Sequence, residues 1–258
     1  MRVAALYDIH GNLPALEAVL DEIRRAGADQ IVVGGDVVPG PMPRETLQRL
    51  LDLDRPVHFI HGNGELAMLA LLAAPAEDAV TYWGTTSGKP LPERYRPVYR
   101  WTAQQLQPDY APVLARWPKT LRLEIDGLGE VVFCHGTPRS ETEIFTRLTP
   151  AERLAPLFDG LRVPVVVCGH THMQFHRQVG RTSVVNAGSV GEPYGASGAC
   201  WLLLGPDIQL RQTPYDLARA AEQIQATAYP QAPEFVQEML HPPSESQMLE
   251  TFTPWEVK

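Results

Sequence analysis

The stretch VAALYDIHGN, residues 3–12, joins a short apolar run to a polar end. Its first five residues are aliphatic or aromatic, and Asp8 and His10 follow directly, before a glycine. A run of this kind predicts a buried strand that ends where the polar residues begin. Ligands bind at the carboxyl ends of strands in layered α/β proteins. The stretch therefore predicts both a first strand and the first part of a ligand site.

The same pattern occurs at four further places along the chain. Apolar runs end at Gly34-Gly35-Asp36, Gly62-Asn63, His135-Gly136 and Gly169-His170-Thr171-His172. The polar residues at the five ends are all Asp, Asn or His, namely Asp8, His10, Asp36, Asn63, His135, His170 and His172. Each alone could be a turn residue or a buried histidine, but together they predict a metal site for two divalent ions. Ligands of this kind, without a thiolate, favour Mn²⁺ or Fe²⁺, with Zn²⁺ or Ni²⁺ as alternatives, and disfavour Ca²⁺.

The order of the expected elements predicts an α/β fold. Apolar residues at helical spacing occur at 13–23, at 44–51 and from Glu65, so the first half follows a βαβαβ order with parallel strands. Short strands are expected at residues 121–125, 130–134, 163–168, 173–179, 183–185, 199–204 and 208–212, and tail helices at 217–228 and 233–240. This order predicts a sandwich of two sheets with flanking helices.

A single domain is expected over residues 1–258, with two additions to the sandwich. A stretch rich in proline and tryptophan, at about residues 75–118, breaks the strand pattern. It is expected to form a small cap insertion with a helix at 98–106. The C-terminal tail, from about residue 214 to 258, is expected to be helical.

The composition is typical of a cytoplasmic globular protein. Three cysteines cannot form a complete set of disulfides, and Cys134 and Cys168 lie in apolar runs, so both are expected to be reduced core residues. The longest apolar stretch, residues 66–74, is too short to span a bilayer, and no signal peptide is visible. The net charge of −8 argues against a polymeric nucleic-acid partner.

The charge is distributed unevenly along the chain. Residues 89–122 contain seven basic and two acidic residues, a balance of +5 that leaves −13 for the rest. Arg96 and Arg100 are four residues apart, as are Tyr95 and Tyr99, so in a helix each pair would share a face. The arginines could neutralise substrate phosphates while Tyr82, Trp83, Tyr95 or Tyr99 stacks on a base. Alternatively, the aromatic side chains form a small core and the arginines are solvated.

The polar blocks resemble, in order and approximate spacing, the five signature blocks of calcineurin-like metallophosphoesterases, from Met1 to about Leu204. The compact bacterial and archaeal phosphodiesterase branch is the most similar, and the block NAGSVG at residues 186–191 also fits it. The resemblance implies an α/β/β/α sandwich with two adjacent metal ions. It assigns Asp8, His10, Asp36 and His172 to one ion, and Asp36, Asn63, His135 and His170 to the other. Asp36 would bridge them, because a carboxylate offers two oxygens.

The resemblance also implies a reaction, in which a metal-bridging hydroxide attacks phosphorus. Asp36, Asn63 and His135 would be the catalytic residues. Many family members continue Gly-Asn-His, where the histidine contacts the phosphate and can protonate the leaving group, but here Gly64 follows Asn63. General acid catalysis contributes about 10²–10⁴-fold, and its loss matters least for a leaving group that is stable as an anion. We therefore expect phosphoanhydrides or activated diesters to be preferred over alkyl monoesters.

Further substrate contacts are expected close to the ligands. Arg139 follows the His135 block and could bind phosphate bidentately or be a solvated loop residue, and Asn12 could bind the phosphate or stabilise its own turn. His61 could supply the missing proton, although strand alternation favours the opposite side. The expected substrate-binding residues are Asn12, Gly64, Arg139, Arg96, Arg100 and Tyr95.

The sequence thus predicts a cytoplasmic, metal-dependent phosphoesterase that acts on phosphodiester or phosphoanhydride bonds. The expected partner is a small phosphorylated substrate, with nucleotides and diadenosine tetraphosphate as candidates. A serine/threonine protein phosphatase and a non-catalytic scaffold of the same fold are the alternatives. Scaffolds tend to lose ligands, whereas all seven positions are intact here. Neither a polymeric nucleic acid nor a membrane is expected as a partner, and a homo-oligomer is left open.

Overall fold

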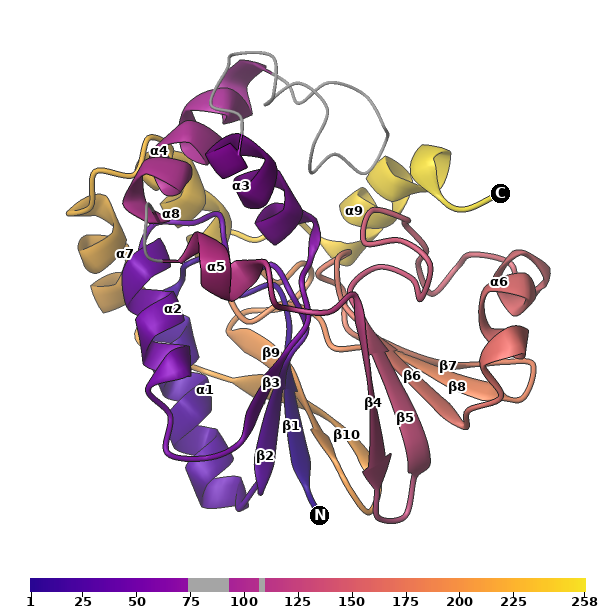
Figure 1. Ribbon diagram of the computed structural model, residues 1–258. Coiled ribbons are helices and arrows are strands. Elements are labelled where there is room, and N and C mark those ends of the chain that lie inside the picture. The colour runs from indigo at the N-terminus through magenta and orange to yellow at the C-terminus, as the bar shows by residue number, and fades with distance from the viewer. Residues whose placement is uncertain (74–92, 107–109) are drawn as a thin grey trace.

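The first sheet contains the strand that precedes Asp8. The computed structural model, which describes residues 1–73, 93–106 and 110–258, orders its five strands β10-β9-β1-β2-β3 (Figure 1). The strands are β1 (Val3–Leu6), β2 (Gln30–Val33), β3 (Val57–Phe59), β9 (Ala199–Leu204) and β10 (Ile208–Thr213). β1, β2 and β3 pair in parallel, which confirms the predicted βαβαβ order.

The second sheet contains five strands in the order β4-β5-β6-β8-β7. These strands are β4 (Thr120–Ile125), β5 (Gly129–Cys134), β6 (Val165–Cys168), β7 (Phe175–Val179) and β8 (Thr182–Asn186). The central pairs β5–β6 and β6–β8 are parallel, and the two outer pairs are antiparallel. The carboxyl ends of β5 and β6 therefore point the same way, which brings the residues that follow them together.

The two sheets pack face to face, and side-chain alternation along β1 shows how. Val3, Ala5 and Tyr7 contribute to a core of aliphatic and aromatic residues between the sheets. Ala4 and Leu6 point the other way, into the core between the first sheet and its helices. A strand that is apolar on both faces is expected where both faces are covered.

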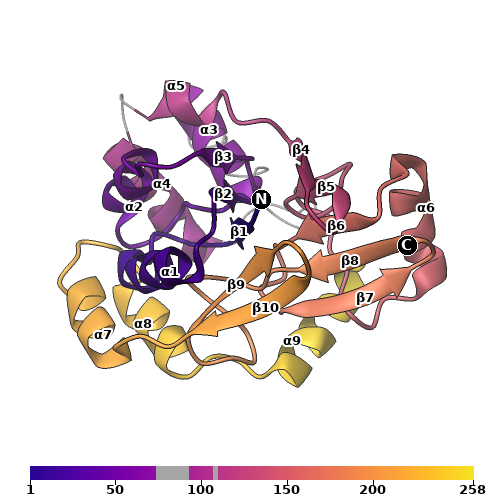
Figure 2. The same cartoon turned by 90° about the horizontal axis from the view of Figure 1, so that it is seen from below.

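Helices cover the outer face of each sheet (Figures 1 and 2). The first sheet carries α1 (Leu13–Ala26), α2 (Pro43–Leu51) and α3 (Asn63–Ala73). The second sheet carries α6 (Ala151–Phe158) and the 3₁₀ turn η3 (Asp159–Leu161). The predicted α/β/β/α sandwich is thus confirmed. Helix α6 was not expected from the sequence, because Pro156 lies inside it.

The described part of the expected insertion adds to the helical layer of the first sheet. It forms η2 (Glu93–Tyr95), α4 (Arg96–Leu106) and α5 (Ala111–Leu114), which confirms the helix expected at 98–106. Leu106 and Leu114 are fully buried in the same core as α1, α2 and α3. This part therefore shares the main core. The rest of the expected insertion, at 75–92 and 107–109, lies outside the described residues.

The C-terminal tail runs along one side of the molecule (Figure 2). It forms the expected helices α7 (Leu217–Gln225) and α8 (Ala232–Leu240), followed by α9 (Glu245–Phe252) and the turn η4 (Thr253–Trp255), which were not expected. α7 and α8 pack against each other around Ile224 and Phe235. Beyond α9, Glu256 forms an isolated β-bridge with Ile144, so the tail reaches the side of the molecule that carries the second sheet.

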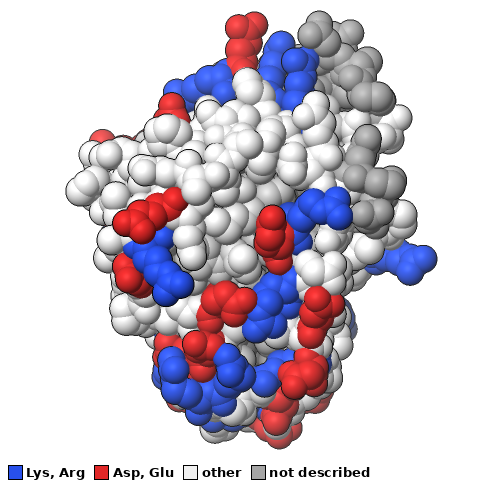
Figure 3. Space-filling model, turned by 90° about the vertical axis from the view of Figure 1, so that its left-hand side faces the viewer, with Lys and Arg blue, Asp and Glu red and all other residues white. Residues whose placement is uncertain are grey.

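The described basic residues of the 89–122 stretch lie in two regions of the fold, three of them on η2 and α4. Arg94, Arg96 and Arg100 lie on η2 and α4, whereas Arg122 lies on β4 and pairs with Glu130 at 2.8 Å. On the face that Figure 3 presents, basic and acidic side chains are intermixed. Among the described residues, Arg49 pairs with Glu17 at 2.6 Å. The described basic residues of this stretch therefore lie on more than one element.

Two further expectations concern the interior and the helices. Cys134 and Cys168 are buried and form no disulfide, which confirms them as core residues. Among the helices of the described ranges, none combines the length and the apolar character needed to cross a bilayer.

Candidate metal centre

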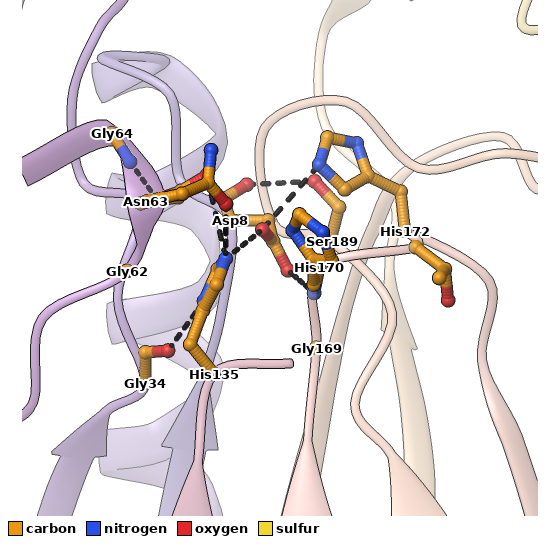
Figure 4. Close-up of polar contacts among 12 residues, drawn as sticks. Asp8, Gly34, Gly62, Asn63, Gly64, His135, Gly169, His170, His172 and Ser189 are labelled. Atoms are coloured by element: carbon orange, nitrogen blue, oxygen red, sulfur yellow. Dashed lines mark hydrogen bonds and ion pairs between the residues drawn. The ribbon is translucent and has the colours of Figure 1, made fainter. Parts of the chain in front are cut away.

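The predicted ligands converge where the carboxyl ends of the central strands of the two sheets meet. Two groups of side chains form there, and within each group the ligand atoms lie within 4.8 Å of one another. The first group is Asp8, His10 and His172, and the second is Asp36, His135 and His170. Figure 4 shows histidines from the second sheet facing Asp8 and Asn63 from the first. Each group therefore takes ligands from both sheets.

The backbone at the ligands is held in an unusual conformation. Six non-glycine residues of the described chain have positive φ, and five of them are predicted ligands: Asp8, His10, Asp36, His170 and His172, with φ from 48° to 67°. Such a conformation costs about 1–3 kcal/mol and persists where surrounding contacts enforce it, commonly at functional sites. Here the N–H of Asp8 donates to Gly35 O and that of His10 donates to Asp36 O, so the two ligand loops hold each other.

Three of the histidines are oriented by backbone carbonyls. The Nδ1 atom of His135 lies 2.9 Å from Gly34 O, that of His172 lies 2.8 Å from Glu192 O, and that of His10 lies 3.2 Å from Pro39 O. Each carbonyl fixes a proton on Nδ1, which leaves Nε2 as the atom that can bind an ion. The Nε2 atoms of His10 and His172 face each other at 3.1 Å.

Each carboxylate presents one oxygen to the centre. Oδ2 of Asp8 accepts the N–H of His170 at 2.8 Å, and Oδ1 of Asp36 accepts the N–H of Gly64 at 2.7 Å. The opposite oxygen of Asp36, Oδ2, lies 3.4 Å from His135 Nε2 and 4.0 Å from His10 Nε2. This single oxygen faces both groups, so the bridging role predicted for Asp36 would fall on Oδ2.

The donor set fits divalent cations. Oδ1 of Asp8 and Nε2 of His170 are buried without a hydrogen-bond partner among the described residues, which is costly unless another group satisfies them. Burial would lower the pKa of His135, but the charges of Asp36 and Asp8 outweigh it and raise the pKa to about 10. Burial would also lower the pKa of His172, but the charge of Asp8 outweighs burial and raises the pKa to about 9. The carboxylates thus attract positive charge to the position where an ion would bind.

Asn63 completes the residues expected at the second group. Its Oδ1 atom lies 3.1 Å from His135 Nε2, so the amide oxygen faces the same centre as the imidazole. The residue opens α3, in the loop region that follows the strand β3. All seven predicted ligands therefore lie around one centre.

Glu65 holds together the loop after β2 and the loop before α3, which carry the ligands Asp36 and Asn63. Its buried carboxylate accepts the N–H groups of Asp36, Val37, Val38 and Gly62 at 2.8–3.2 Å. Burial and the charge of Asp36 raise the pKa of Glu65 to about 7, while the four N–H donors favour its ionised form. The sequence pattern gave Glu65 no role; an acidic residue in the first turn of an otherwise apolar helix was the available signal.

Gly64 is fixed by its surroundings. A Cβ atom there would lie 2.0 Å from the carbonyl oxygen of Val38, so no side chain fits without moving the backbone. Its N–H already binds Asp36. The structure thus gives Gly64 a structural role at the ligand Asp36, and a substrate contact stays a prediction.

Asn12 has a structural role, and its binding of substrate stays a prediction. Its side chain is fully buried and caps α1, where Oδ1 accepts the N–H of Ala15 at 3.1 Å. Nδ2 donates to Gly191 O at 2.9 Å and to the Tyr215 hydroxyl at 3.3 Å. Because both polar atoms are bound within the protein, the structure favours the turn-stabilising alternative.

The other expected substrate contacts differ in their surroundings. Arg139 is exposed and forms an ion pair with Glu143 at 2.7 Å, so a phosphate would have to compete with that carboxylate. Arg94 stacks on Tyr95 and donates to its hydroxyl. Nε of Arg96 is buried without a hydrogen-bond partner in the described ranges, and Arg100 is exposed. Substrate binding by Arg139, Arg96, Arg100 and Tyr95 stays a prediction.

His61 has a carboxylate partner outside the ligand set. Its Nδ1 atom lies 3.4 Å from Glu141 Oε1. Burial lowers the pKa of His61, which disfavours the protonated form that a general acid needs. The structure gives no support for His61 as the proton donor.

The family of the chain follows from comparison with known proteins. Residues 1–206 match the family model described as the calcineurin-like phosphoesterase superfamily domain. The chain belongs to the calcineurin-like phosphoesterase superfamily, as its polar blocks predicted. The fold of this family implies divalent metals, and the two groups above are the candidate positions for them.

Relatives in sequence and in structure cover most of the chain. Phosphodiesterase YfcE of Escherichia coli K12 is 25% identical over 217 residues, which are 81% of this chain and 89% of that protein. An uncharacterized protein of Methanocaldococcus jannaschii is 24% identical over 89% of this chain and 94% of its own length. The structure of a metallophosphoesterase from Sphaerobacter thermophilus has a TM-score of 0.68 at 27% identity, covering 93% of this chain and 98% of that one. A hypothetical protein of Pyrococcus horikoshii has the same fold, with a TM-score of 0.74 at 19% identity over 92% of this chain and 97% of that one.

Proposed function

We propose that this protein is a binuclear metal-dependent phosphoesterase that hydrolyses phosphodiester or phosphoanhydride bonds. The observation that carries the proposal is the convergence of seven predicted ligands from both sheets, with one oxygen of Asp36 facing both groups. The family and the sequence similarity to a phosphodiesterase support the same reaction class. We propose Mn²⁺ or Fe²⁺ as the ions, a cytoplasmic location, and a small phosphorylated substrate.

Different residues of the centre would bind the ions, orient the ligands and fix the ligand loops. Two divalent ions lower the pKa of a bound water and neutralise charge on a phosphate. The backbone carbonyls at Gly34, Pro39 and Glu192 keep the Nε2 atoms of three histidines ready as ligands. Asp36 would contribute a ligand to both ions, and Glu65 fixes the loops that carry Asp36 and Asn63.

The substrate proposed is one with a good leaving group. No side chain fits at Gly64, so the position next to Asn63 cannot supply a proton. A phosphate or nucleotide leaves as a stable anion, whereas an alkoxide needs protonation. Dinucleoside polyphosphates such as diadenosine tetraphosphate, other nucleotides and activated diesters are therefore proposed ahead of sugar phosphates.

The reaction class is tested by removing and restoring the metal. Protein treated with EDTA should be inactive on bis-p-nitrophenyl phosphate, and added Mn²⁺ should restore hydrolysis. An Asp36→Asn variant keeps the shape of the side chain and should lose metal content and activity together. A wild-type protein that binds no metal and hydrolyses no phosphate ester would overturn the proposal in favour of a non-catalytic scaffold.

The substrate class is tested by a screen with Mn²⁺. We expect kcat/KM to be higher for a dinucleoside polyphosphate than for a sugar phosphate of the same charge. Faster hydrolysis of the sugar phosphate would contradict the leaving-group argument while leaving the reaction class intact. Preferential hydrolysis of a phosphoserine peptide would favour the protein phosphatase alternative.

A further inference from the structure

Glu192 places an additional carboxylate beside the first ligand group. Its Oε2 atom lies 3.9 Å from Nε2 of His10, and its side chain is 23% exposed. Within the described residues, His10 is the one basic group within 4 Å of this carboxylate. Sequence reasoning assigned Glu192 no role, because it lies in a loop that follows β8 rather than directly at a strand end.

The backbone of Glu192 is tied to two of the ligands. Its carbonyl accepts the Nδ1 proton of His172 at 2.8 Å, and the N–H of Tyr194 donates to His172 O at 3.1 Å. The N–H of Glu192 donates to Oγ of Ser189 at 2.7 Å, and that hydroxyl donates to Asp8 O at 2.7 Å. The position from which this side chain starts is therefore fixed relative to Asp8 and His172.

The surroundings of Glu192 are aromatic. The ring of Tyr194 stacks on that of His172, with 5.0 Å between centroids and 23° between planes. Burial is the main cause that raises the pKa of both Tyr194 and Tyr229, and the charge of Glu192 is the second cause. Rings that exclude water lower the local dielectric, which strengthens the attraction between a carboxylate and a nearby cation.

We propose that Glu192 is a further ligand of the ion held by Asp8, His10 and His172. The proposal rests on the metal centre of the proposed function and deepens it. Two ligand atoms of one ion, each about 2.1 Å from it, lie up to about 4.2 Å apart, and the 3.9 Å between Glu192 and His10 is within that limit. Glu192 lies outside the compact three-residue group, so its side chain would have to rotate toward the ion to complete the coordination.

The added carboxylate changes the chemistry of this position. With Glu192, the group holds two carboxylates and two imidazoles beside the shared Asp36. Oxygen ligands favour Mn²⁺, whereas imidazole ligands suit Zn²⁺, Ni²⁺ and Fe²⁺. Glu192 therefore shifts the preference of this position toward Mn²⁺, and a substrate phosphate would compete with its carboxylate for the ion.

The test measures metal binding rather than activity. Metal-stripped wild-type protein and its Glu192→Gln variant are titrated with Mn²⁺ by calorimetry, with bound Mn²⁺ counted by electron paramagnetic resonance. We expect two Mn²⁺ sites in the wild type. In E192Q, the affinity of one site should fall by about 10–100-fold and that of the other should not change. This is the range of affinity lost when a supporting group is removed from a metal site. Unchanged affinity at both sites in E192Q would overturn the inference.

Two further variants separate ligation from general electrostatics. Glu238 is exposed and lies close enough to Glu192 and His172 for their charges to act on its carboxyl group. Glu238→Gln therefore removes one negative charge near the first ligand group, as Glu192→Gln does, but at a residue that is not among the described ion-pair partners of His10. We expect E238Q to change Mn²⁺ affinity less than threefold; a loss equal to that of E192Q would overturn the inference. Glu192→Asp keeps the charge and shortens the side chain, so weakened binding there supports ligation and wild-type binding contradicts it.

The same titration distinguishes this inference from the proposed function. A wild-type protein that binds no Mn²⁺ refutes the proposed function itself. A wild-type protein that binds two ions, together with an unaffected E192Q, refutes only the role of Glu192. Circular dichroism of the metal-free variants checks that each is folded before titration.

Discussion

Single residues around Asp36 show how closely the ligand loops approach each other. Gly64 lets the backbone of α3 pass next to Val38, and its N–H binds one oxygen of Asp36. Glu65 then binds four N–H groups from the two loops. The ligand geometry depends on backbone contacts that a larger residue at position 64 would break.

A Gly64→Ala substitution is expected to damage both stability and activity. Its Cβ would lie 2.0 Å from Val38 O, and overpacking of this kind costs about 1–3 kcal/mol. Urea denaturation and hydrolysis of bis-p-nitrophenyl phosphate measure the two effects. Gly160→Ala is the matched control, because a Cβ there meets nothing within 4 Å, and it should change stability by less than about 0.5 kcal/mol. Equal behaviour of the two variants would refute the argument.

The pH dependence of the metal-free protein follows from His135 and His172. Burial lowers the pKa of both histidines, but neighbouring carboxylates outweigh burial and raise the pKa of His135 to about 10 and that of His172 to about 9. A raised pKa in the folded state contributes stability that is complete below the unfolded value of about 6.5 and is lost as pH rises through the folded value. In EDTA, the free energy of unfolding should therefore fall between pH 7 and 9.5, and fall less in His135→Gln. A flat wild-type profile would count against this charge pattern.

At the scale of elements, α1 begins with a cap that also joins the tail. Asn12 caps the helix through Oδ1 and binds Gly191 and Tyr215 through Nδ2. The residue thus connects the loop after β1, the loop after β8 and the segment that leads into α7. Its importance is structural, since no polar atom of the side chain remains for a substrate.

An Asn12→Ala variant is expected to lose stability without losing substrate affinity. Loss of an N-cap costs about 0.5–2 kcal/mol, and the lost contacts to Gly191 and Tyr215 add to it. KM for bis-p-nitrophenyl phosphate should stay within about twofold of the wild type. Ser244→Ala removes the exposed cap of α9 and provides a comparison with the loss of a different helix cap. A tenfold rise in KM for Asn12→Ala would instead support its predicted role in substrate binding.

The sequence predicted strands well, because a strand is marked by an apolar run that lies within a few residues. Every strand after Leu121 was expected within two residues of its observed bounds, because apolar runs end at turn residues. Helix α6 was missed because Pro156 interrupts its pattern, and α9 was missed although Ser244 and Gln247 form a capping box. The roles of Glu65 and Glu192 depend on backbone groups and side chains distant in sequence, which no local pattern contains.

At the scale of the whole molecule, the centre joins the two sheets. The first group combines Asp8 and His10, after β1, with His172, after β6. The second combines Asp36, after β2, with His135 and His170. The two layers meet through apolar packing and through hydrogen bonds such as that from His170 N–H to Asp8. Ions bound to these groups would add further links between the layers, so metal binding should be coupled to global unfolding.

Mn²⁺ is therefore expected to raise the thermal midpoint of unfolding. An ion at 100 times its dissociation constant adds about 2.7 kcal/mol, which corresponds to roughly 5–10 °C in a protein of this size. Differential scanning calorimetry of EDTA-treated and Mn²⁺-loaded protein measures the shift. Asp36→Asn should reduce the shift, while His176→Gln, an exposed histidine on β7, should retain it. Identical midpoints with and without Mn²⁺ would mean that the ions do not link the sheets.

The left-handed backbone at five ligands has a consequence for mutational tolerance. Asp8, His10, Asp36, His170 and His172 all have positive φ, a region that asparagine, aspartate, histidine and glycine enter far more easily than β-branched residues do. In a saturation library selected for folding alone, glycine and asparagine should survive at these five positions, while valine and isoleucine should be depleted. These positions are therefore constrained twice, once by the shape of the chain and once by the chemistry of the centre.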